Sequence, residues 1–317
     1  MKISLITPAP RHSRTGNRVT ALRWARILRS LGHRVTIEKE YRGRRCDVMV
    51  ALHARRSFSS IDRFRSAYPE LPVILALTGT DLYGDIHTDA QAQRALGMAT
   101  RFVVLQPLGA AQLPEGMRKN VRVIYQSANP PRGKVSRKKN VFEVCVLAHL
   151  RKVKDPLRAA AAARMLAPSS KIQVIHIGGA LSGEMEKRAS AEAAANPRYR
   201  WLGETPRWKA LRILSHCRVH VLSSEMEGGA NAVTEAIACS VPTLSSKIDG
   251  SIGLLGEDYP GYFPFGDTRA LASLLERAET DAAFYEALNE RSERQRPIVD
   301  PLQERRSWED LLREILG

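Results

Sequence analysis

Short apolar runs alternate with amphipathic stretches along most of this 317-residue chain. The runs are rich in Val, Ile and Leu and lack polar–apolar alternation, which is typical of parallel β-strands covered on both faces. In the first half, strands are predicted at residues 3–7, 34–37, 47–52, 73–77, 101–105 and 121–125. Helical periodicity covers residues 17–30, 57–67 and 90–99. This βα order predicts a doubly wound α/β sheet with right-handed connections.

The alternation restarts after a polar segment at residues 127–140, which contains two prolines, a glycine and several Arg and Lys residues. Such a composition is typical of a linker between domains. Beyond it, strands are predicted at residues 142–147, 172–177, 199–202, 219–222 and 243–245, and helices at residues 156–166, 182–195, 206–215 and 230–239. After about residue 267 the pattern is helical. We therefore expect two Rossmann-like domains, residues 1–130 and 140–297, which face a ligand-binding cleft at the carboxyl ends of their strands.

The chain carries a formal charge of +16, with 49 Lys and Arg against 33 Asp and Glu. Such a field attracts nucleic acids, acidic membranes or phosphorylated small molecules. Basic stripes with interleaved aromatic residues are missing, so the charge alone does not select a partner. No apolar run approaches the roughly 18 to 20 residues that cross a bilayer. The apolar stretch at the N-terminus is too short for a signal peptide, and we expect a cytoplasmic protein without integral membrane association.

The four cysteines, Cys46, Cys145, Cys217 and Cys239, are far apart and form no CxxC pair. This spacing predicts buried reduced thiols and argues against a metal site built from cysteines.

The segment from Glu227 to Glu235 carries the most chemical information. It follows the predicted strand 219–222, makes a glycine-bearing turn and opens a helix. Gly228 and Gly229 let the backbone approach a ligand closely, and a helix start offers N–H groups to a phosphate. A diphosphate would repel carboxylates, so we expect the two glutamates to accept hydrogen bonds from sugar hydroxyls on either side of it. The alternative is a structural strand–turn–helix with a capping glutamate.

A basic loop follows the first predicted strand. It contains Arg11, Arg14 and Arg18, and Gly16 and Asn17 open a helix there, so the loop can cradle an anion. The spacing matches neither a P-loop nor a GxGxxG motif. We expect this loop to bind a phosphorylated acceptor; the alternative is a charged surface loop.

Two further loops follow predicted strands and should end at the same edge. One contains His53 and Arg55, and the other contains Thr80 and Asp81. We assign Arg55, Thr80 and Asp81 to acceptor binding and His53 to catalysis, although a lone histidine is more often structural.

The motif Glu227-x7-Glu235, with the following residues 236–238 and 241–242, resembles the donor-site signature of retaining GT-B glycosyltransferases of the GT4 type. The resemblance implies that Glu235 binds the ribose hydroxyls of a nucleotide and that Glu227 faces the transferred sugar. It implies that the turn and helix start hold the diphosphate through Gly228, Gly229, Ala230, Asn231 and Ala232. It also implies a GT-B fold in which residues 298–317 pack back on the first domain.

The loop at residues 148–156 supports this resemblance. The family usually has a Gly-Arg-Leu stretch here, with a lysine five residues after the arginine, and both cations neutralise the departing diphosphate. Lys154 matches the lysine. The arginine position falls on His149, which is a departure from the family, and Arg151 lies two residues later and would take over its role. The alternative is a solvated basic turn.

The similarity extends over nearly the whole chain. The segments 7–10, 15–20, 51–57, 77–83, 104–108, 125–128, 226–231 and 256–264 resemble the selenosugar synthases of selenoneine biosynthesis. This resemblance implies a UDP-sugar donor, such as UDP-N-acetylglucosamine, and selenophosphate as the acceptor. Selenium attacks the anomeric carbon, UDP departs and phosphate is lost. We expect no metal, because the Asp-x-Asp motif of metal-dependent transferases is missing and the basic loops can stabilise the diphosphate. We also expect no cofactor.

Two other functions stay open. An O-glycosyltransferase with a sugar or lipid-linked acceptor would favour an apolar or aromatic groove over the arginines at positions 11, 14, 18 and 55. A non-catalytic nucleic-acid-binding protein would show steeply salt-dependent binding to DNA.

Overall fold

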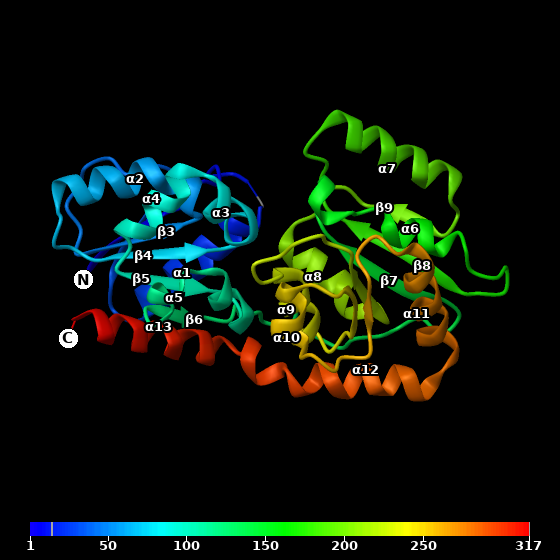
Figure 1. The fold of residues 1–317 in the computed structure, drawn as a ribbon. Helices are drawn as coiled ribbons and strands as arrows, with labels where there is room; N and C mark the ends of the chain where they lie inside the picture. Colours follow the sequence, from blue (N-terminus) through cyan, green and yellow to red (C-terminus); the bar gives the residue numbers. More distant parts are fainter. Residues whose placement is uncertain (14, 317) are drawn as a thin grey trace. The chain divides into compact units, whose positions relative to one another are not determined.

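Two units, each built on its own parallel sheet, make up the chain (Figure 1). The computed structural model describes residues 1–13 and 15–316. Unit 1 comprises Met1–Gln126, Glu227–Gly229 and Pro301–Gly317, and unit 2 comprises Ser127–Met226 and Ala230–Asp300. The polar segment 127–140 is therefore counted with unit 2.

The sheet of unit 1 has, within the described residues, six strands in the order β2-β1-β3-β4-β5-β6. The strands are β1 (Lys2–Ile6), β2 (Arg34–Glu38), β3 (Val48–Leu52), β4 (Val73–Leu77), β5 (Arg101–Val104) and β6 (Val121–Val123). All neighbours pair in parallel. Every residue of β3 and β4 is buried, because helices cover both faces of these central strands. The predicted doubly wound sheet is confirmed.

Alternate residues along the unit 1 strands enter two separate cores. On one face, Leu5 and Val50 pack with residues of α1 (Gly16–Ser30) and α13 (Pro301–Leu316). On the other face, Met49 and Leu75 pack with α2 (Ala54–Ala67) and α4 (Ala90–Met98). Shorter elements complete the unit: the π-helix η1 (Asp81–Asp85), α3 (Ile86–Thr88), the 3-10 helix η2 (Pro107–Gln112) and α5 (Glu115–Arg118).

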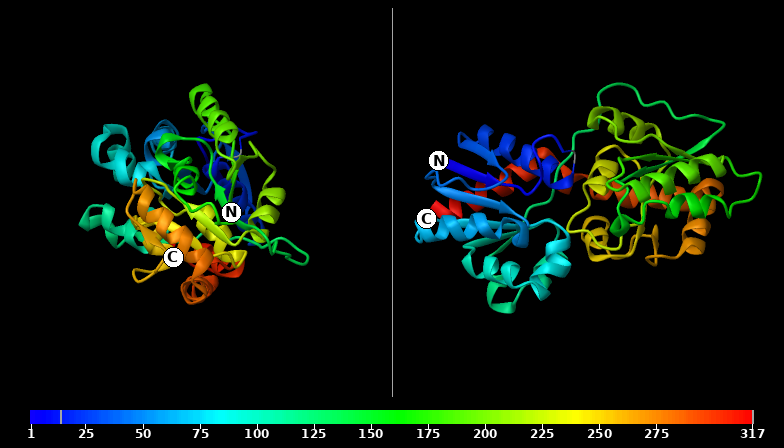
Figure 2. Two further views of the ribbon diagram at one scale, coloured as in Figure 1. Left: turned by 90° about the vertical axis from the view of Figure 1, so that its right-hand side faces the viewer. Right: turned by 90° about the horizontal axis from the view of Figure 1, so that it is seen from above.

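A buried polar contact joins α1 to α13, which lie side by side in Figures 1 and 2. The Glu304 carboxylate accepts hydrogen bonds from Arg23 Nε at 3.1 Å and from Trp24 Nε1 at 2.8 Å. Trp24 also packs edge-on against Trp308, with ring centroids 4.8 Å apart. These contacts make the last helix part of the unit 1 core.

The sheet of unit 2 has six described strands in the order β12-β11-β10-β7-β8-β9. They are β7 (Phe142–Leu147), β8 (Ile172–Ile177), β9 (Tyr199–Trp201), β10 (Val219–Leu222), β11 (Thr243–Ser246) and β12 (Tyr262–Phe263), all parallel to their neighbours. Only β12 was not predicted, because two residues leave no periodic pattern.

The helices of unit 2 are α6 (Arg158–Ala163), α7 (Gly183–Ala195), α8 (Arg207–His216), α9 (Asn231–Ala238), α10 (Asp249–Leu255), α11 (Thr268–Thr280) and α12 (Ala282–Arg294), with 3-10 helices η3 (Lys152–Lys154) and η4 (Arg296–Val299). The helical region predicted after residue 267 is divided into α11 and α12, and each of these helices begins after a capping aspartate. Asp267 accepts the Ala270 amide at 2.9 Å, and Asp281 accepts the Phe284 amide at 3.0 Å. Each aspartate begins a new helix because its carboxylate satisfies an amide of the first turn.

All four cysteines are buried and reduced, as the sequence indicated. Burial raises the pKa of Cys46 to about 11, since the thiolate would lose its hydration there. Such a thiol stays protonated and unreactive at neutral pH.

Candidate active site

In unit 2, the loop that follows β7 is fastened to the loop that follows β10. Ser223 Oγ lies 2.8 Å from the Asp155 carbonyl oxygen and 3.2 Å from that of Lys154, and it is the donor. The Glu225 amide donates to the Val153 carbonyl at 2.9 Å. Because β7 and β10 are neighbours in the sheet, their carboxyl ends bring these two loops together. The basic turn η3 is thereby held beside the segment that leads to α9.

The turn η3 presents several cations within one short stretch. Arg151 and Lys154 are half-buried, whereas Lys152 is exposed. Asp155, the acidic residue that follows, has a left-handed φ of 40° and accepts a 2.6 Å hydrogen bond from Arg158 Nε. Its charge is therefore engaged by the first residue of α6. The turn keeps a net positive charge, as a site for an anion requires.

The helix α9 begins without a capping side chain on its own N-cap residue. Its N-cap residue is Ala230, which has no side-chain group that can accept a hydrogen bond, and the first turn contains no acidic residue. The first amides of a helix carry partial positive charge and are suited to bind phosphate. Asn231 and Ala232 lie in this turn, where the sequence placed the diphosphate.

The Glu235 carboxylate is held by an arginine that the sequence did not single out. Glu235 is 7% exposed, and its Oε1 accepts from Arg207 Nε at 2.8 Å and forms an ion pair with Nη2 at 2.7 Å. Arg207 is the first residue of α8 and lies 28 positions earlier in the chain. The ion pair fixes the orientation of the Glu235 carboxylate.

His149 is fastened to the loop that follows β8. Its Nδ1 accepts the Gly179 amide at 3.1 Å. The adjacent backbone is so close that a Cβ at Gly178 would lie 1.9 Å from the Ala148 carbonyl oxygen. A side chain at position 178 would force these loops apart.

Glu227, Gly228 and Gly229 are counted with unit 1 rather than unit 2. A Cβ on Gly228 would lie 2.6 Å from the Thr78 carbonyl carbon, and one on Gly229 would lie 2.5 Å from Leu105 Cβ. The missing side chains of the two glycines thus allow this segment to pack closely against Thr78 and Leu105. The sequence analysis had predicted a different role for them, contact with a ligand. Glu227 itself is buried.

In unit 1, Asp81 organises the loops after β3 and β4. It is fully buried, and its carboxylate accepts the amides of Ala54, Thr78 and Gly79 at 2.9 to 3.1 Å. Backbone amides therefore already bind the Asp81 carboxylate oxygens, which the sequence analysis assigned to binding the acceptor substrate. The neighbouring Thr80 is half-buried and precedes η1.

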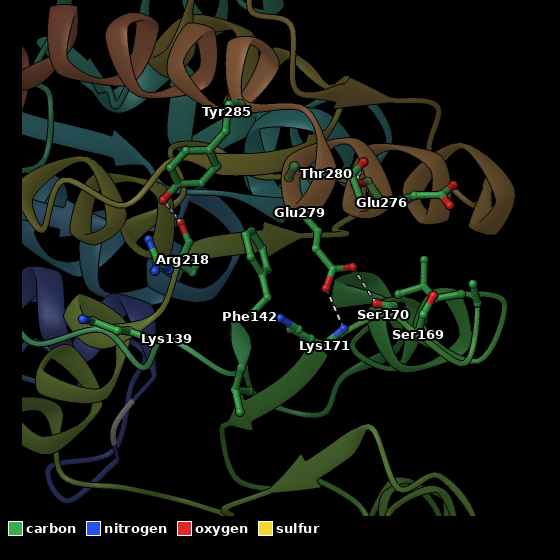
Figure 3. A pocket seen from close by; sticks show the side chains of 15 residues that line it. Lys139, Phe142, Ser169, Ser170, Lys171, Arg218, Glu276, Glu279, Thr280 and Tyr285 are labelled. Atoms are coloured by element: carbon green, nitrogen blue, oxygen red, sulfur yellow. Dashed lines mark hydrogen bonds between the residues drawn. The ribbon is translucent and has the colours of Figure 1, made fainter.

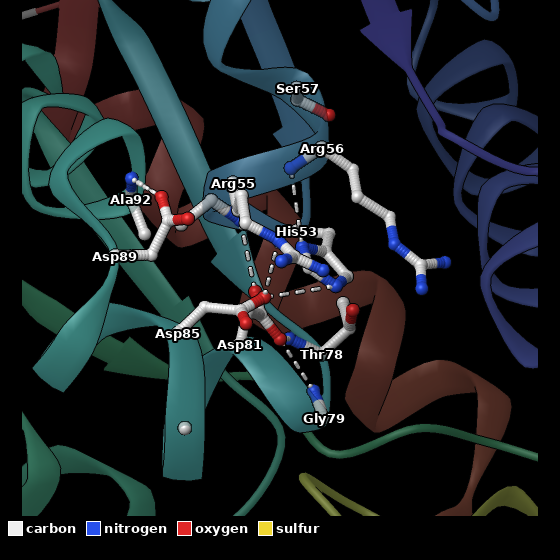
Figure 4. Close-up of polar contacts among 12 residues, drawn as sticks. His53, Arg55, Arg56, Ser57, Thr78, Gly79, Asp81, Asp85, Asp89 and Ala92 are labelled. Atoms are coloured by element: carbon white, nitrogen blue, oxygen red, sulfur yellow. Dashed lines mark hydrogen bonds and ion pairs between the residues drawn. The ribbon is translucent and has the colours of Figure 1, made fainter.

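His53 lies at the start of α2 and faces Asp85 (Figure 4). The histidine has a left-handed φ of 74° and is 3% exposed. Its Nε2 is 3.7 Å from Asp85 Oδ2, and Arg55 Nε is 3.3 Å from the same oxygen. Burial lowers the pKa of His53 below 6.5, although the charges of Asp81 and Asp85 oppose this shift. Asp85 was not predicted as a site residue.

The first turns of α1 and α2 carry basic residues and no acidic ones. Gly16 begins α1, and Asn17 and the half-buried Arg18 follow, while Arg11 is exposed in the preceding loop. Arg14 lies outside the described residues. Cations at helix N-termini oppose the helix dipole, so these two starts are favourable places for a bound anion.

Sequence similarity places the chain in a known family. A family model described as glycosyl transferases group 1 matches residues 130–295, more than half of the chain. The chain belongs to the group 1 glycosyl transferases. Comparison with curated protein sequences gives no match.

Solved structures share the fold of this glycosyltransferase over nearly its whole length. HepE of Anabaena in complex with UDP and glucose has a TM-score of 0.76 at 14% identity, covering 99% of this chain and 100% of that one. Sucrose-phosphate synthase from Thermosynechococcus elongatus has a TM-score of 0.77 at 15% identity, covering 99% of each. An α,α-trehalose-phosphate synthase (UDP-forming) from Burkholderia vietnamiensis has a TM-score of 0.69 at 13% identity, covering 96% of this chain and 82% of that one. The predicted GT-B fold is confirmed.

A cavity of about 570 Å³ opens in unit 2 of the glycosyltransferase, near the amino ends of β7 and β8 (Figure 3). Its walls include Lys139, Phe142 and Arg218, and no residue that the sequence assigned to the donor. Glu279 there accepts hydrogen bonds from Ser170 Oγ and the Lys171 amide, so it joins α11 to the loop before β8. We assign this cavity no part in sugar transfer, because ligands of open α/β sheets bind at the carboxyl ends of the strands.

Across residues 1–13 and 15–316 of the glycosyltransferase, no helix is both long and apolar enough to cross a bilayer. The same residues contain no cluster of three or more His, Cys, Asp or Glu side chains that could hold a metal ion.

Proposed function

We propose that this glycosyltransferase transfers a sugar, expected to be N-acetylglucosamine, from a UDP-sugar to selenophosphate. The reaction forms a carbon–selenium bond and releases UDP and phosphate. The observation that carries the donor half is the Ser223 hydrogen bond that holds the basic turn η3 beside the loop leading from β10 to the start of α9. The UDP bound to HepE, and the description of the Burkholderia synthase as UDP-forming, support UDP as the nucleotide.

On this proposal, the diphosphate accepts hydrogen bonds from the first amides of α9, around Asn231 and Ala232. Lys154 and Arg151 balance the charge that develops on UDP as the glycosidic bond breaks, where fixed cations are most effective. Glu235 accepts hydrogen bonds from the ribose hydroxyls. Glu227 faces the transferred sugar.

The acceptor half rests on the similarity to selenosugar synthases and on the basic starts of α1 and α2. Selenophosphate is a small, strongly anionic nucleophile, so no base is needed to deprotonate it before attack. The protein then has to hold two anions in reacting geometry, which lowers the entropic part of the barrier. We propose that the reaction needs neither metal nor cofactor and that it takes place in the cytoplasm.

The acceptor is tested by measuring UDP release from UDP-N-acetylglucosamine with and without selenophosphate. We expect release to depend on selenophosphate, and a product whose mass corresponds to a selenosugar. Hydroxyl acceptors offered in parallel test O-glycosyl transfer. If UDP release does not depend on selenophosphate but increases with a hydroxyl acceptor, the proposed donor is supported and the proposed acceptor is refuted.

Replacing Glu235 by alanine is expected to weaken UDP binding. Hydrogen bonds to a charged group contribute about 1.5 to 3 kcal/mol, which corresponds to a roughly 10- to 100-fold higher Kd. Isothermal titration with UDP measures the change, and thermal stabilisation by UDP provides a second readout. The exposed Glu186, on α7, supplies the matched control as Glu186→Ala. Equal Kd values for Glu235→Ala and wild type would refute the ribose assignment, and steep salt-dependent DNA binding without any stabilisation by UDP would favour the nucleic-acid alternative.

A further inference from the structure

Two complementary buried atoms in unit 1 lie just beyond hydrogen-bonding distance of each other. His53 Nε2 and Asp85 Oδ2 are 3.7 Å apart, and neither makes a hydrogen bond within the described residues; Asp85 Oδ2 also forms an ion pair with Arg55 Nε at 3.3 Å. Most buried polar atoms in proteins have a hydrogen-bond partner, so each such pair calls for a reason. Catalytic hydrogen bonds are often long before substrate binds and shorten in the complex.

The other ring nitrogen of His53 determines how the pair can work. Nδ1 accepts the Arg56 amide at 3.5 Å, a long and weak contact at the first turn of α2. The ring proton is therefore on Nε2, which faces the Asp85 carboxylate. A general-base histidine has this arrangement: a carboxylate orients the ring through one nitrogen, and the other nitrogen is free of a proton and can accept one.

The backbone around this pair is unusual in two places. His53 has a positive φ of 74°, a region that non-glycine residues adopt at a cost of about 1 to 3 kcal/mol. Asp85 ends the π-helix η1, and π-turns occur frequently at functional sites. Asp81, which accepts the amides of Ala54, Thr78 and Gly79, holds the two loops in place.

Beside His53, the first turn of α2 presents cations to solvent. Arg55 and Arg56 are exposed in the first turn of α2, and the helix dipole disfavours cations at that position. A phosphate group bound there would accept the Arg56 amide that now contacts His53 Nδ1. That exchange would leave the Nδ1 lone pair facing the phosphate.

We propose that His53, positioned by Asp85, is the general base for hydrolysis of the phosphorus–selenium bond that remains after sugar transfer. This inference rests on the proposed selenophosphate acceptor. Water attacks phosphorus and gives a proton to His53 Nδ1. The phosphorus–selenium bond breaks, and its electron pair leaves on selenium as the selenolate of the sugar. The proton then passes to a phosphate oxygen, so the products are the selenolate and dihydrogen phosphate, and no oxidant or reductant is needed.

The test is Asp85→Asn, assayed for UDP, for phosphate above an enzyme-free blank, and for the mass of the sugar product. Wild type is expected to release phosphate and UDP in equal amounts. In Asp85→Asn we expect the phosphate-to-UDP ratio to fall at least about tenfold, with a selenosugar that retains its phosphate group, since general-base catalysis contributes roughly 10²- to 10⁴-fold. The control is Asp62→Asn, because the Asp62 carboxylate is 42% exposed on α2 and pairs at the surface with Arg94.

Acid pH supplies a readout that a purely structural role would not move. The charged groups around the His53 ring are Asp81, Asp85, Arg55 and Arg56. Phosphate release by wild type is expected to fall as the ring becomes protonated, with an inflection below pH 6.5 because burial lowers the pKa of His53. Asparagine at position 85 removes a negative charge, so the inflection of the residual activity should move to lower pH.

The outcomes separate the two proposals. A wild-type enzyme that releases no UDP with selenophosphate refutes the acceptor and this inference together. An active wild type whose product ratio is unchanged in Asp85→Asn refutes this inference alone, as does a parallel loss of UDP and phosphate. Asp85→Glu keeps the carboxylate and should restore part of the ratio, and thermal stabilisation by UDP shows that each variant is folded.

Discussion

Replacing Lys154 by alanine is expected to lower kcat by about 100- to 1,000-fold, the usual effect of removing one group that stabilises developing charge. Lys154 ends the 3-10 turn η3, and its carbonyl group accepts a hydrogen bond from Ser223. Its ammonium is proposed to balance the negative charge on departing UDP. Because that charge is greatest in the transition state, turnover should fall more than the affinity for the UDP-sugar. Steady-state kinetics with varied UDP-sugar measures kcat and KM separately.

The same turn provides the control. Lys152 is exposed two residues earlier, and Lys152→Ala removes an identical charge from the same turn. We expect it to change kcat less than about threefold, since a solvated cation contributes little. Equal losses of kcat in the two variants would mean that the total positive charge of the turn, and not the position of Lys154, supports turnover. Full activity of Lys154→Ala would refute the donor-site assignment.

Replacing Glu304 by alanine is expected to destabilise unit 1 by about 3 to 5 kcal/mol, because removing one partner of a buried ion pair strands the other charge. Glu304 is 1% exposed and forms an ion pair with Arg23 Nε at 3.0 Å, and the Trp24 indole donates to it at 2.8 Å. The variant leaves a buried guanidinium and an indole N–H without this acceptor. A loss of this size corresponds to a melting temperature roughly 10 °C lower, which calorimetry can measure.

Glu309→Ala on the same helix is the control. Its carboxylate is 47% exposed and 3.7 Å from Arg313, so we expect a change of at most about 0.5 kcal/mol. Glu304→Gln should fall between the two, because it keeps an acceptor but removes the charge. A loss below about 1 kcal/mol in Glu304→Ala would show that Arg23 finds another partner or reaches solvent.

Local patterns were sufficient to predict the described strands of both sheets except β12. The central strands β3 and β4 are continuous apolar runs, and burial on both faces produces such runs in any parallel sheet. The start of α2 was predicted three residues late, at position 57 instead of Ala54. The actual start depends on the left-handed His53 and on the Asp81 carboxylate, which accepts the Ala54 amide from 27 positions away. Periodicity within the helix carries no information about that contact.

In the candidate site, too, local sequence patterns indicated some features, whereas contacts between distant residues could not be predicted. The segment around Glu235 could be proposed as a donor site because a strand, glycines and a helix start follow one another in the sequence. The partner of Glu235 could not, since Arg207 looks like any other basic residue at a helix start until α8 and α9 are brought together. Asp85, which we propose positions His53, could not be predicted for a related reason. Its distance from His53 is set by a π-helix, which has no sequence signature comparable to that of an α-helix.

The Trp308 side chain, buried against α1, has a consequence for how the protein is made. During translation, all strands of the unit 1 sheet have been synthesised by residue 126, yet the face that α1 covers in part lacks its second helix, α13, until residue 308 follows. At ordinary elongation rates of about 5 to 20 residues per second, this delay lasts roughly 10 to 35 s. Throughout that interval unit 2 is synthesised while an apolar surface of the nascent chain stays uncovered, so this face is a natural place for a chaperone to bind.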